Sequence, residues 1–512
     1  TGIQGNIVND GAVVFDQSVA GGYSGELSGT GGVVLAGTGT ITLTGANSYS
    51  GGTTVNAGGT LTGTTTGIQG NIVNDGAVVF DQSVAGTFGG ELSGIGGLTV
   101  AGTGAISLTG ANSYSGGTTI NTGGTLSGTT TGIQGDILNN GALIFDQSLD
   151  GDFLGLLSGT GGVVLNGTGA IALTNTSNTF SGGVIVNSGV LRITSDAALG
   201  SGAITLNGGG LDLTLAQLAP GRQLITLGQV QQVAVDTGDF VFTGGILGSG
   251  IEKVGLGTLT FNYDNSGFTG DIYVNGGTIR ALTAQSFGSA TIHMVDPNIQ
   301  YSATGSYASN IVLEVAAPSS VDPSTLTVDA GIVATISGSI TQTANGDTVQ
   351  PLVIAGSGTL VLTNAANSWN GSTTINSGAT LQGTAATISG GNIVSNGTLA
   401  LNQGVDGTFG LDISGTGGVT SMGPAELTLS GTNTYSGRTQ INAGTLIAGG
   451  GSAIGDTSAV TVAGGATLSL AGSETIGSLV GSGTVRVNAN TLTVGGDNAS
   501  TEFSGSITDQ AA

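Results

Sequence analysis

The chain has 512 residues, 101 of them glycine, and its net charge is −24 because 30 acidic side chains outnumber 6 basic ones. So few cations cannot neutralise phosphates, which argues against nucleic acid as a partner. The absence of cysteine excludes disulfides and thiolate metal sites. Hydrophobic residues make up 38% of the sequence, too many for a disordered chain. No apolar run is long enough to span a membrane, so we expect no membrane insertion by this segment.

The first part of the chain repeats itself almost unchanged. Residues 1–65 and 66–130 align without a gap and differ at only 12 of 65 positions, and a third copy begins at Thr131. Within residues 40–43, the second copy keeps the Ile and the final Leu but changes the other two positions. Such a period of two indicates a short β-strand with one buried and one solvated face. Glycine, asparagine and serine separate the strands, as turns do.

Helical signals are almost absent, with possible single turns only at residues 195–199 and 214–218. A phrase of an apolar residue, Asn, a small residue and Gly recurs along the chain. Its turn asparagines are Asn56, Asn121, Asn187, Asn275, Asn376 and Asn442. Four of their five separations are close to multiples of 22, whereas a propeller blade needs about 40–45 residues. We therefore predict an all-β fold, a parallel β-helix or β-solenoid with about 22 residues per coil.

Regularity divides the chain into three predicted parts. Residues 1–195 hold the near-identical 65-residue repeats, 196–350 form a less regular β-helix with insertions, and 351–512 continue the repeats. The one irregular separation of the turn phrase contains Pro297, Pro318 and Pro323, which fits an insertion there.

An aromatic residue occupies one slot of the repeated phrase. Its members are Tyr49, Tyr114, Phe180, Phe268, Trp369, Tyr435 and Phe503. One interpretation is a carbohydrate-stacking row, and the other is a packing plug at a bend of the coil. We favour the plug, because Tyr, Phe and Trp exchange at this slot and the slots lie several coils apart.

The phrases "LTGANSYSGGTTVNAGGTL", "TNTYSGRTQINAGTL" and "NTLTVGGDNASTEFSGSI" resemble the passenger-associated repeats of bacterial autotransporters. The resemblance covers most of the chain and marks a secreted passenger of type V secretion, not an activity. It implies a right-handed parallel β-helix that is exported across the outer membrane of a Gram-negative bacterium. The expected localisation is therefore extracellular, at the cell surface.

Catalytic signals are sparse. The single histidine, His293, lies among apolar residues and we assign it a structural role, and no G-x-S-x-G elbow is present. If a β-helical polysaccharide-active enzyme were hidden here, a lyase or hydrolase, its site would lie in the irregular centre. The candidates there are Arg222, Glu252, Lys253, Asp264 and Arg280. Convergence of the three cations with carboxylates in one groove would support that alternative.

We predict no cofactor, and calcium is the alternative to that prediction. The acidic Asp16, Asp81 and Asp146 occupy the same position in successive copies and would lie about three coils apart on stacked faces, too far to share one ion. The preferred interpretation is a non-enzymatic, rod-like surface protein for cell adhesion, self-association, or assembly of a surface layer or filament. Expected partners are other copies of the chain, or glycans and proteins of host or bacterial surfaces.

Overall fold

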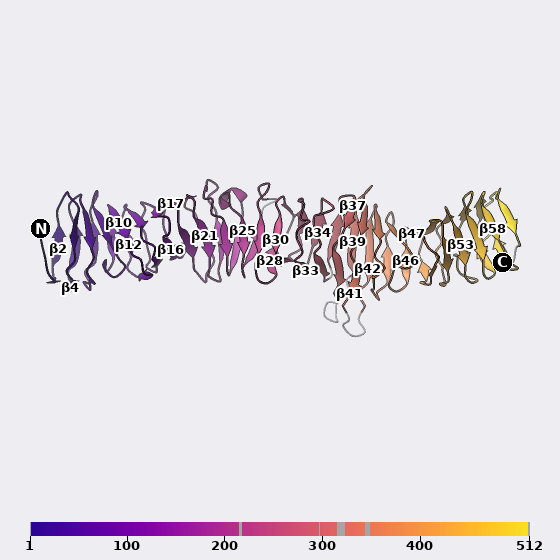
Figure 1. The fold of residues 1–512 in the computed structure, drawn as a ribbon, viewed down its shortest axis with the longest axis horizontal. Coiled ribbons are helices and arrows are strands. Elements are labelled where there is room, and N and C mark those ends of the chain that lie inside the picture. The colour runs from indigo at the N-terminus through magenta and orange to yellow at the C-terminus, as the bar shows by residue number, and fades with distance from the viewer. Residues whose placement is uncertain (1, 215–217, 296, 315–322, 344–348, 510–512) are drawn as a thin grey trace. The chain divides into compact units, whose positions relative to one another are not determined.

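The computed structural model describes residues 2–214, 218–295, 297–314, 323–343 and 349–509. Short β-strands dominate these residues (Figure 1), and the 3₁₀ turn η1 (Asp196–Leu199) lies within the predicted turn at 195–199. The second predicted turn, at 214–218, includes residues 215–217, which lie outside the described residues. Contacts divide the chain into two units: Thr1–Ala234 with Thr243–Leu247, and Val235–Phe242 with Gly248–Ala512. The three-part division stays a prediction.

The first unit is a stack of parallel strands in several sheets, each named here after its first strand. The strands of the β2 sheet are β2 Ala12–Phe15, β5 Gly32–Leu35, β7 Thr53–Val55, β9 Ile72–Asn74 and β12 Leu92–Ser93. The strands of the β3 sheet are β3 Gly21–Tyr23, β6 Thr40–Leu43, β8 Thr60–Gly63, β10 Ala77–Phe80, β13 Gly97–Val100, β15 Thr118–Ile120, β17 Ile137–Asn139 and β20 Leu157–Ser158. The strands of the β11 sheet are β11 Gly86–Phe88, β14 Ala105–Leu108, β16 Thr125–Gly128, β18 Ala142–Phe145, β21 Gly162–Leu165, β23 Val184–Val186, β25 Ile204–Leu206, β27 Leu224–Thr226 and β30 Ile246–Gly248. The first unit also contains β1 Ile7–Val8 paired with β4 Leu27–Ser28, and the β19 sheet of β19 Gly151–Phe153, β22 Ala170–Leu173, β24 Val190–Ile193, β26 Gly210–Leu213 and β28 Gln231–Ala234.

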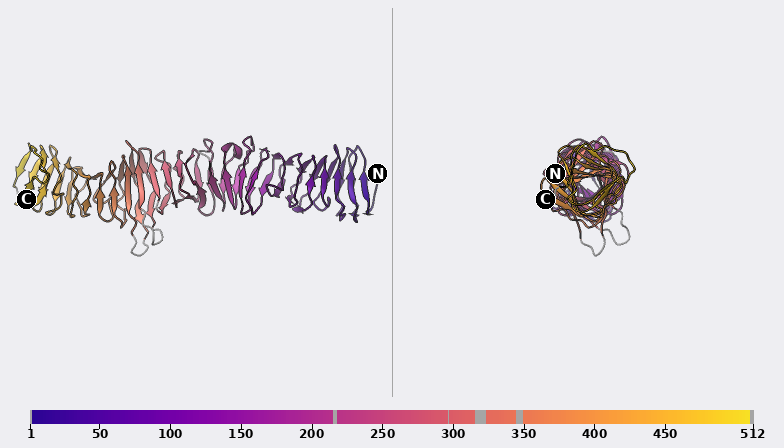
Figure 2. Two further views of the ribbon diagram at one scale, coloured as in Figure 1. Left: turned by 180° about the vertical axis from the view of Figure 1, so that it is seen from behind. Right: turned by 90° about the vertical axis from the view of Figure 1, so that its right-hand side faces the viewer.

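The second unit is built in the same way (Figure 2). One sheet contains β31 Gly250–Val254, β33 Asp271–Val274, β35 Thr291–Met294, β38 Asn310–Leu313 and β41 Ile340–Gln342. The β29 sheet contains β29 Asp239–Phe242, β32 Thr258–Phe261, β34 Thr278–Ala281, β36 Asn298–Tyr301, β39 Ser324–Val328, β42 Leu352–Gly356, β44 Thr373–Ile375, β46 Ile393–Ser395 and β49 Ile413–Ser414. The β37 sheet contains β37 Gly305–Tyr307, β40 Val333–Ile336, β43 Thr359–Leu362, β45 Thr380–Gly383, β47 Thr398–Asn402, β50 Gly418–Met422, β52 Thr439–Ile441, β54 Val460–Val462 and β57 Leu479–Gly481. The remaining strands are β48 Gly407–Phe409, β51 Glu426–Leu429, β53 Thr445–Ala448, β55 Thr467–Leu470, β58 Thr484–Arg486 and β60 Ser506–Thr508 in one sheet, and β56 Glu474–Ile476 paired with β59 Leu492–Val494.

Each unit is thus a parallel β-helix, as the sequence predicts. Successive turns pair residue by residue: Val33 pairs with Thr53, and Thr53 pairs with Ile72. Ile72 in turn pairs with Leu92. One turn therefore takes about 20 residues, and the predicted coil, with a period near 22, is too long. A period near 22 fits three turns into separations of 65 and 66, but these separations are not whole numbers of turns.

The 65-residue repeat is in fact not a whole number of turns. A turn has three sides, since β9, β10 and β11 lie in three different sheets before β12 returns to the first. Three turns from Val33 end at Leu92 in the same sheet, whereas Leu98, the counterpart of Val33 in the second copy, lies in the next sheet. Val163, its counterpart in the third copy, lies one sheet further on. Each copy is therefore turned by one side relative to the previous copy.

The interior of each coil is filled by alternate residues of its strands. In β6, for example, Ile41 is 3% and Leu43 0% exposed, while the alternating Thr40 and Thr42 are partly exposed to solvent. Because one coil cannot bury its own apolar side, the stacked neighbours complete a continuous core. The burial pattern thus agrees with the period of two in the sequence.

Buried asparagines clip neighbouring coils together. Asn112 Oδ1 accepts a hydrogen bond from Leu92 N at 2.8 Å, and its Nδ2 donates to Gly132 O at 2.7 Å. Leu92 lies one turn before Asn112 and Gly132 lies one turn after it, so one amide connects three turns. The same two-sided contact is made by Asn47, Asn178, Asn367 and Asn433. Loss of such an amide would leave two backbone groups without partners in the core.

Candidate functional site

The most distinctive outer feature is a loop that recurs in every copy. It comprises residues 16–20, 81–85 and 146–150 in the first unit, where it follows β2, β10 and β18. In the second unit it comprises residues 402–406, which begin at the last residue of β47. We call these the tip loops. The first three begin with Asp-Gln-Ser, and the fourth has Asn-Gln-Gly instead.

A glutamine braces the tip loop from within. In the second copy, Gln82 Oε1 accepts a hydrogen bond from Thr65 N of the previous turn at 2.7 Å. Its Nε2 donates to Val84 O within the loop at 2.8 Å. Gln147 makes the same two contacts in the third copy, at 2.7 and 2.9 Å. The loop is therefore held to the coil by a side-chain amide with both ends engaged.

The two ends of the loop and the next turn fix it further. Phe80 before the loop and Phe88 after it pack with ring centroids 5.3 Å apart in the core. On the other side, the glycines Gly102 and Gly104 lie so close to the loop backbone that a Cβ at either would collide with Gln82 or Val84. Gly104 N also donates to Gln82 O at 2.7 Å. The loop is a fixed projection, since each contact involves backbone or a buried ring.

The braced loop presents an aliphatic residue to solvent. The exposed fractions are 70% for Val19, 75% for Val84, 78% for Leu149 and 77% for Val405. The same position is aliphatic and more than two-thirds exposed in all four loops, although neighbouring loop positions differ. Packing cannot account for this choice, because these side chains bury little surface.

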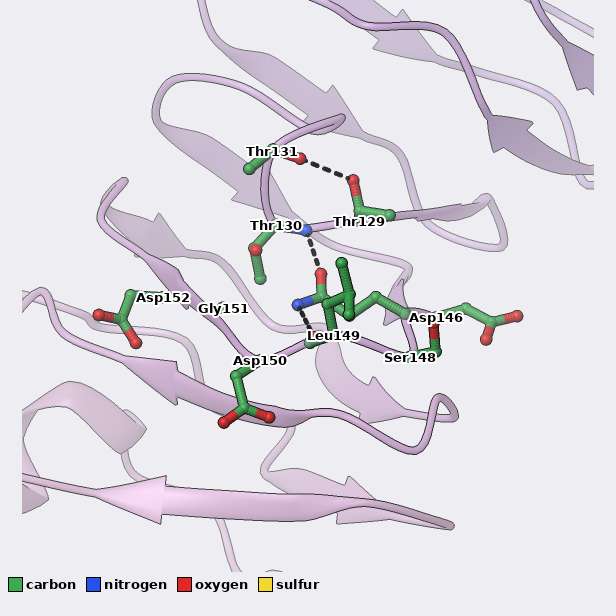
Figure 3. Close-up of a pocket in the computed structure, with 10 residues that line it drawn as sticks. Thr129, Thr130, Thr131, Asp146, Ser148, Leu149, Asp150, Gly151 and Asp152 are labelled. Atoms are coloured by element: carbon green, nitrogen blue, oxygen red, sulfur yellow. Dashed lines mark hydrogen bonds between the residues drawn. The ribbon is translucent and has the colours of Figure 1, made fainter.

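A hollow lies under each tip loop of the second and third copies. In the third copy its volume is about 420 Å³, and it is lined by Thr129, Thr130, Thr131, Asp146, Gln147, Ser148, Leu149, Asp150, Gly151 and Asp152 (Figure 3). The second-copy hollow, about 380 Å³, has the equivalent threonines and Asp81, but Ala85 in place of Asp150. Of these two hollows, only that of the third copy has two further carboxylates, Asp150 and Asp152. The Asp152 carboxylate forms an ion pair with Arg192 at 3.0 Å. The hollow offers hydroxyls and carboxylates around an apolar tip.

The three tip loops of the first unit lie at three different corners. The first connects the β2 sheet to the β3 sheet, the second connects the β3 sheet to the β11 sheet, and the third connects the β11 sheet to the β19 sheet. Consequently Asp16, Asp81 and Asp146 do not lie on stacked faces, and that expectation was wrong. The tips instead wind around the helix, one corner per copy.

Six segments of the chain match the family model described as Passenger-associated-transport-repeat: residues 33–62, 98–127, 163–193, 251–281, 352–382 and 422–448. The chain carries passenger-associated-transport repeats. It is also 30% identical over 456 residues to the adhesin BmaC autotransporter of Brucella suis biovar 1 (strain 1330). That match covers 88% of this chain and 10% of the relative, so the chain spans about a tenth of that protein. The resemblance predicted from the sequence is confirmed.

The passenger-associated repeats contain the coil-building residues and leave the tip loops outside. Each match in the first unit begins in a strand and ends in the strand that follows the turn phrase. The loops at 81–85 and 146–150 fall between matches. The repeats therefore identify the scaffold, and the projecting loops are additions to it.

The turn asparagines named from the sequence lie at outer bends. Asn56 and Asn121 are exposed, and Asn275 Nδ2 donates to Glu252. Asn187 Nδ2 donates to Asn166 Oδ1 at 2.8 Å, and it accepts from Asn207 at 3.0 Å. Asn376 and Asn442 are also exposed at such bends. Sequence reasoning missed the clip asparagines, which stand two residues before the aromatic slot and gain partners only when the coils stack.

Six of the seven slot aromatics lie in the core. Tyr49, Tyr114, Phe180, Phe268, Trp369 and Tyr435 are at most 2% exposed, and Phe503 is half-buried. The polar aromatics each bond a threonine four residues later: Tyr49 with Thr53, Tyr114 with Thr118, Trp369 with Thr373 and Tyr435 with Thr439. The phenylalanines are instead followed at that distance by Val184, Ile272 and Ile507. The residue four positions after the aromatic is therefore a threonine where the ring can form a hydrogen bond, and an aliphatic residue where it cannot. Burial also raises the pKa of Tyr435 to about 12.

Arg222, in the first unit, forms hydrogen bonds with backbone carbonyls. It forms a two-point ion pair with Asp196, with Nε–Oδ1 at 2.6 Å, and its guanidinium also donates to Gly200 O and Gly202 O. Only 4% of its side chain is exposed. All of these partners are structural, so no guanidinium nitrogen is directed to an open groove.

Lys253, in the second unit, is fully buried. It is the third residue of its passenger-associated repeat, where four of the five other repeats have Leu35, Val100, Leu165 and Ile354. Its Nζ donates to Val254 O at 3.0 Å, Gly255 O at 2.6 Å and Gly276 O at 3.0 Å. Burial lowers the pKa of Lys253 to about 8, and Asp236 opposes this effect. The ammonium replaces an aliphatic core residue and caps the carbonyls of a bend.

The other central candidates are partnered separately. Arg280 bonds Asp239 at 2.8 Å and Gln300 at 2.9 Å on the outside of the β29 sheet. Asp264 accepts from Ser266 N within its own bend, which lowers the pKa of that carboxyl. Lys253 and Arg280 thus lie in different sheets with different partners, so they do not show the convergence in one groove that would support the enzyme alternative.

The histidine lies on the outer face of the sheet that contains β31, β33 and β35. The rings of His293 and Tyr273 stack with centroids 4.2 Å apart, and His293 Nδ1 lies 2.6 Å from Glu314 Oε1. Among the described residues, no group of three or more potential side-chain ligands has a geometry that could hold a metal ion. Within the same residues no helix has the length and apolar character needed to cross a membrane.

Proposed function

We propose that the chain is a structural and adhesive surface protein that engages its partners through the tip loops. The observation that carries this proposal is the solvent-exposed aliphatic residue at the same place in four tip loops, three of which are braced by a glutamine. An exposed aliphatic side chain fixed by its backbone loses little entropy when it is covered by a partner. Several tip loops on one chain, each binding weakly, can also bind one surface together and so raise the overall affinity.

The proposed setting is the outside of a Gram-negative bacterium, displayed or released as a secreted passenger. The passenger-associated repeats and the similarity to an autotransporter adhesin support this localisation. The proposed roles are cell adhesion, self-association, or assembly of a surface layer or filament. The partners proposed are proteins or glycans of cell surfaces, or other copies of the chain. No enzymatic activity or cofactor is part of the proposal.

The test is binding of the purified chain to cells and to arrayed surface proteins and glycans. A variant with Val19→Ser, Val84→Ser, Leu149→Ser and Val405→Ser removes the four tips. We expect it to bind at least ten-fold more weakly, while its circular dichroism spectrum stays unchanged, because the tips do not contribute to the core.

The matched control changes neighbouring exposed loop residues, with Ser18→Ala, Ser83→Ala and Ser148→Ala. We expect this variant to bind as the parent chain does, with and without calcium. Binding by the tip variant at parental strength would refute the role of the tips. Absence of binding by the parent chain to every surface tested would refute adhesion itself.

A further inference from the structure

The outer face of the β11 sheet carries a stripe of branched residues across five turns. Register places Ile144 beside Val164, and Val164 beside Ile185. The ladder continues through Thr205 to Ile225. Ile185, on the middle rung, is 38% exposed, and the other four are partly exposed. We call these five residues the outer stripe. Two of the strands that carry it, β21 and β25, are labelled in Figure 1.

The equivalent faces of the first two copies are more polar. The counterpart of Ile185 is Thr54 in the first copy and Thr119 in the second. These residues lie in the β2 and β3 sheets, because each copy is turned by one side. The side chain at this position points outward in all three copies, so the change from threonine to isoleucine in the third copy alters the outer surface.

The outer stripe lies on a face with almost no charge. The residues directly before its five strands are Gly141, Gly161, Gly183, Ala203 and Gln223, and the residues directly after them are Asp146, Asn166, Asn187, Asn207 and Leu227. Asp146 is therefore the only charged residue among the strands of this face and their immediate neighbours. By contrast, Arg192 and Asp212 pair as neighbours on the outside of the β19 sheet in the same turns. In a chain of net charge −24, this face is one where two copies approach with little carboxylate repulsion.

A ladder of amides runs along the stripe. Asn187 connects Asn166 and Asn207 by side-chain hydrogen bonds of 2.8 and 3.0 Å, so the three amides are aligned at the ends of their strands. The face therefore has an aliphatic row with an ordered, uncharged polar row beside it. Such a pattern of regularly spaced rungs is complementary to itself, because a second copy has the same spacing.

We propose that the outer stripe is a docking surface for a second copy of this chain. The two stripes lie face to face, the helix axes of the two copies run in opposite directions, and Ile185 lies at the centre of the contact. A two-fold axis parallel to the strands brings the middle rung of one copy against the middle rung of the other. In this arrangement the amide row of one copy lies opposite the amide row of the other. It also keeps the two Asp146 carboxylates four rungs, or about 19 Å, apart along the stack. The inference rests on the proposed function as a self-associating surface protein.

The size of the stripe sets the strength expected. Five rungs and a four-residue strand span about 19 by 13 Å, or roughly 250 Å² per copy. A standard interface buries about 800 Å² per partner. The pair is therefore weak in dilute solution, and self-association becomes substantial only at high protein concentration or where many copies share one surface.

Single cysteines test the contact directly, because the chain has none of its own. Facing sheets pack about 10 Å apart, so a short bis-maleimide reaches between two middle rungs. We expect Ile185→Cys to form a covalent dimer at high protein concentration and the matched Thr119→Cys to form at least five-fold less. Ile144→Cys alone should crosslink poorly, whereas a mixture with Ile225→Cys should crosslink well. Equal crosslinking of the first two variants, or efficient crosslinking of Ile144→Cys alone, would overturn the proposal.

Sedimentation equilibrium of the full chain provides the second readout. Ile185→Glu should weaken self-association at least ten-fold, and Thr119→Glu should leave it unchanged. Both measurements use purified chain without any cell or glycan. Loss of adhesion by the tip variant with normal crosslinking through Ile185→Cys therefore separates the two proposals. A monomeric parent chain at millimolar concentration would refute the docking surface and leave the adhesive loops untouched.

Discussion

The first two copies of the repeat and the third share their interior and differ on their outside. All three keep a clip asparagine, a buried aromatic and the alternating Ile and Leu of their strands. On the outside, the third copy replaces Thr54 and Thr119 by Ile185, and it adds Asp150 to the tip loop and Asp152 to the strand that follows the loop. The comparison teaches that stacking fixes the inner residues, whereas outer residues can change without cost to the coil.

Removal of an inner asparagine should have the largest effect. Asn112→Ala leaves Leu92 N and Gly132 O without partners in the core, which costs about 3 kcal/mol of local stability. Hydrogen exchange of the flanking strands measures this loss. Asn121→Ala, at an exposed bend, is the control and should change stability by no more than about 0.5 kcal/mol. Equal losses for the two variants would contradict the division between inner and outer residues.

Lys253 extends the comparison to a repeat with a cation at an inner position. Its folded pKa of about 8 lies below the ordinary value of 10.5, so the folded state favours the neutral amine. The free energy of unfolding should therefore rise between about pH 8 and 10.5, and the contribution is least favourable below pH 8. The rise should be on the order of 1–3 kcal/mol.

Lys253→Leu restores the residue type of the other repeats and should abolish this rise. Denaturant midpoints across pH 7–10 measure it, and Arg486→Leu, at an exposed position, is the control for lost positive charge. A rise that persists in Lys253→Leu would show that another group causes it.

The aromatic slot offers a smaller and more specific test. Tyr114→Phe leaves Thr118 and Gln134 N without the phenolic partner, for a loss of about 1 kcal/mol. Thr118→Val in the same chain recreates the Phe180 and Val184 pair of the third copy. The double variant should be more stable than the sum of the single effects by about 0.5–1 kcal/mol. Strict additivity would mean that the pairing does not determine the fourth residue.

The outer ion pairs should contribute least. Arg192 pairs with Asp152 at 3.0 Å, but both side chains are substantially in solvent. Arg192→Ala should therefore lower stability by less than about 0.5 kcal/mol. The thermal midpoint provides the measurement, and a loss comparable to that of Asn112→Ala would show that the third copy depends on its outer charges.

The strands and their inward sides could be predicted from the sequence because near-identical copies report which positions tolerate change. Ile41 and Leu43 persist and are buried, as the alternation requires. The turn length could not be obtained in the same way. The spacing of the copies fits a whole number of turns with a period near 22, and only the pairing of Val33 with Thr53 shows that the step is shorter.

The sites were harder to predict because their partners come from other turns. Asn112 acts as a clip through residues one turn before and one turn after it, and no local motif marks it. The sequence makes Lys253 a candidate for a polysaccharide-active site because it is a cation near carboxylates in the irregular centre, yet its three carbonyl partners make it a cap. In the sequence, only the recurring aspartates mark the tip loops, because their Val and Leu resemble ordinary strand residues.

The mismatch between repeat length and turn length has a consequence for chains that gain or lose copies. Recombination between near-identical copies changes a gene by whole repeat units. Each added unit lengthens the stack by about three and a third turns, or roughly 16 Å. It also rotates the coils that follow it about the helix axis by about a third of a revolution. Copy number therefore sets the azimuth of distal surfaces as well as their distance, and three units must be gained or lost together to restore their direction.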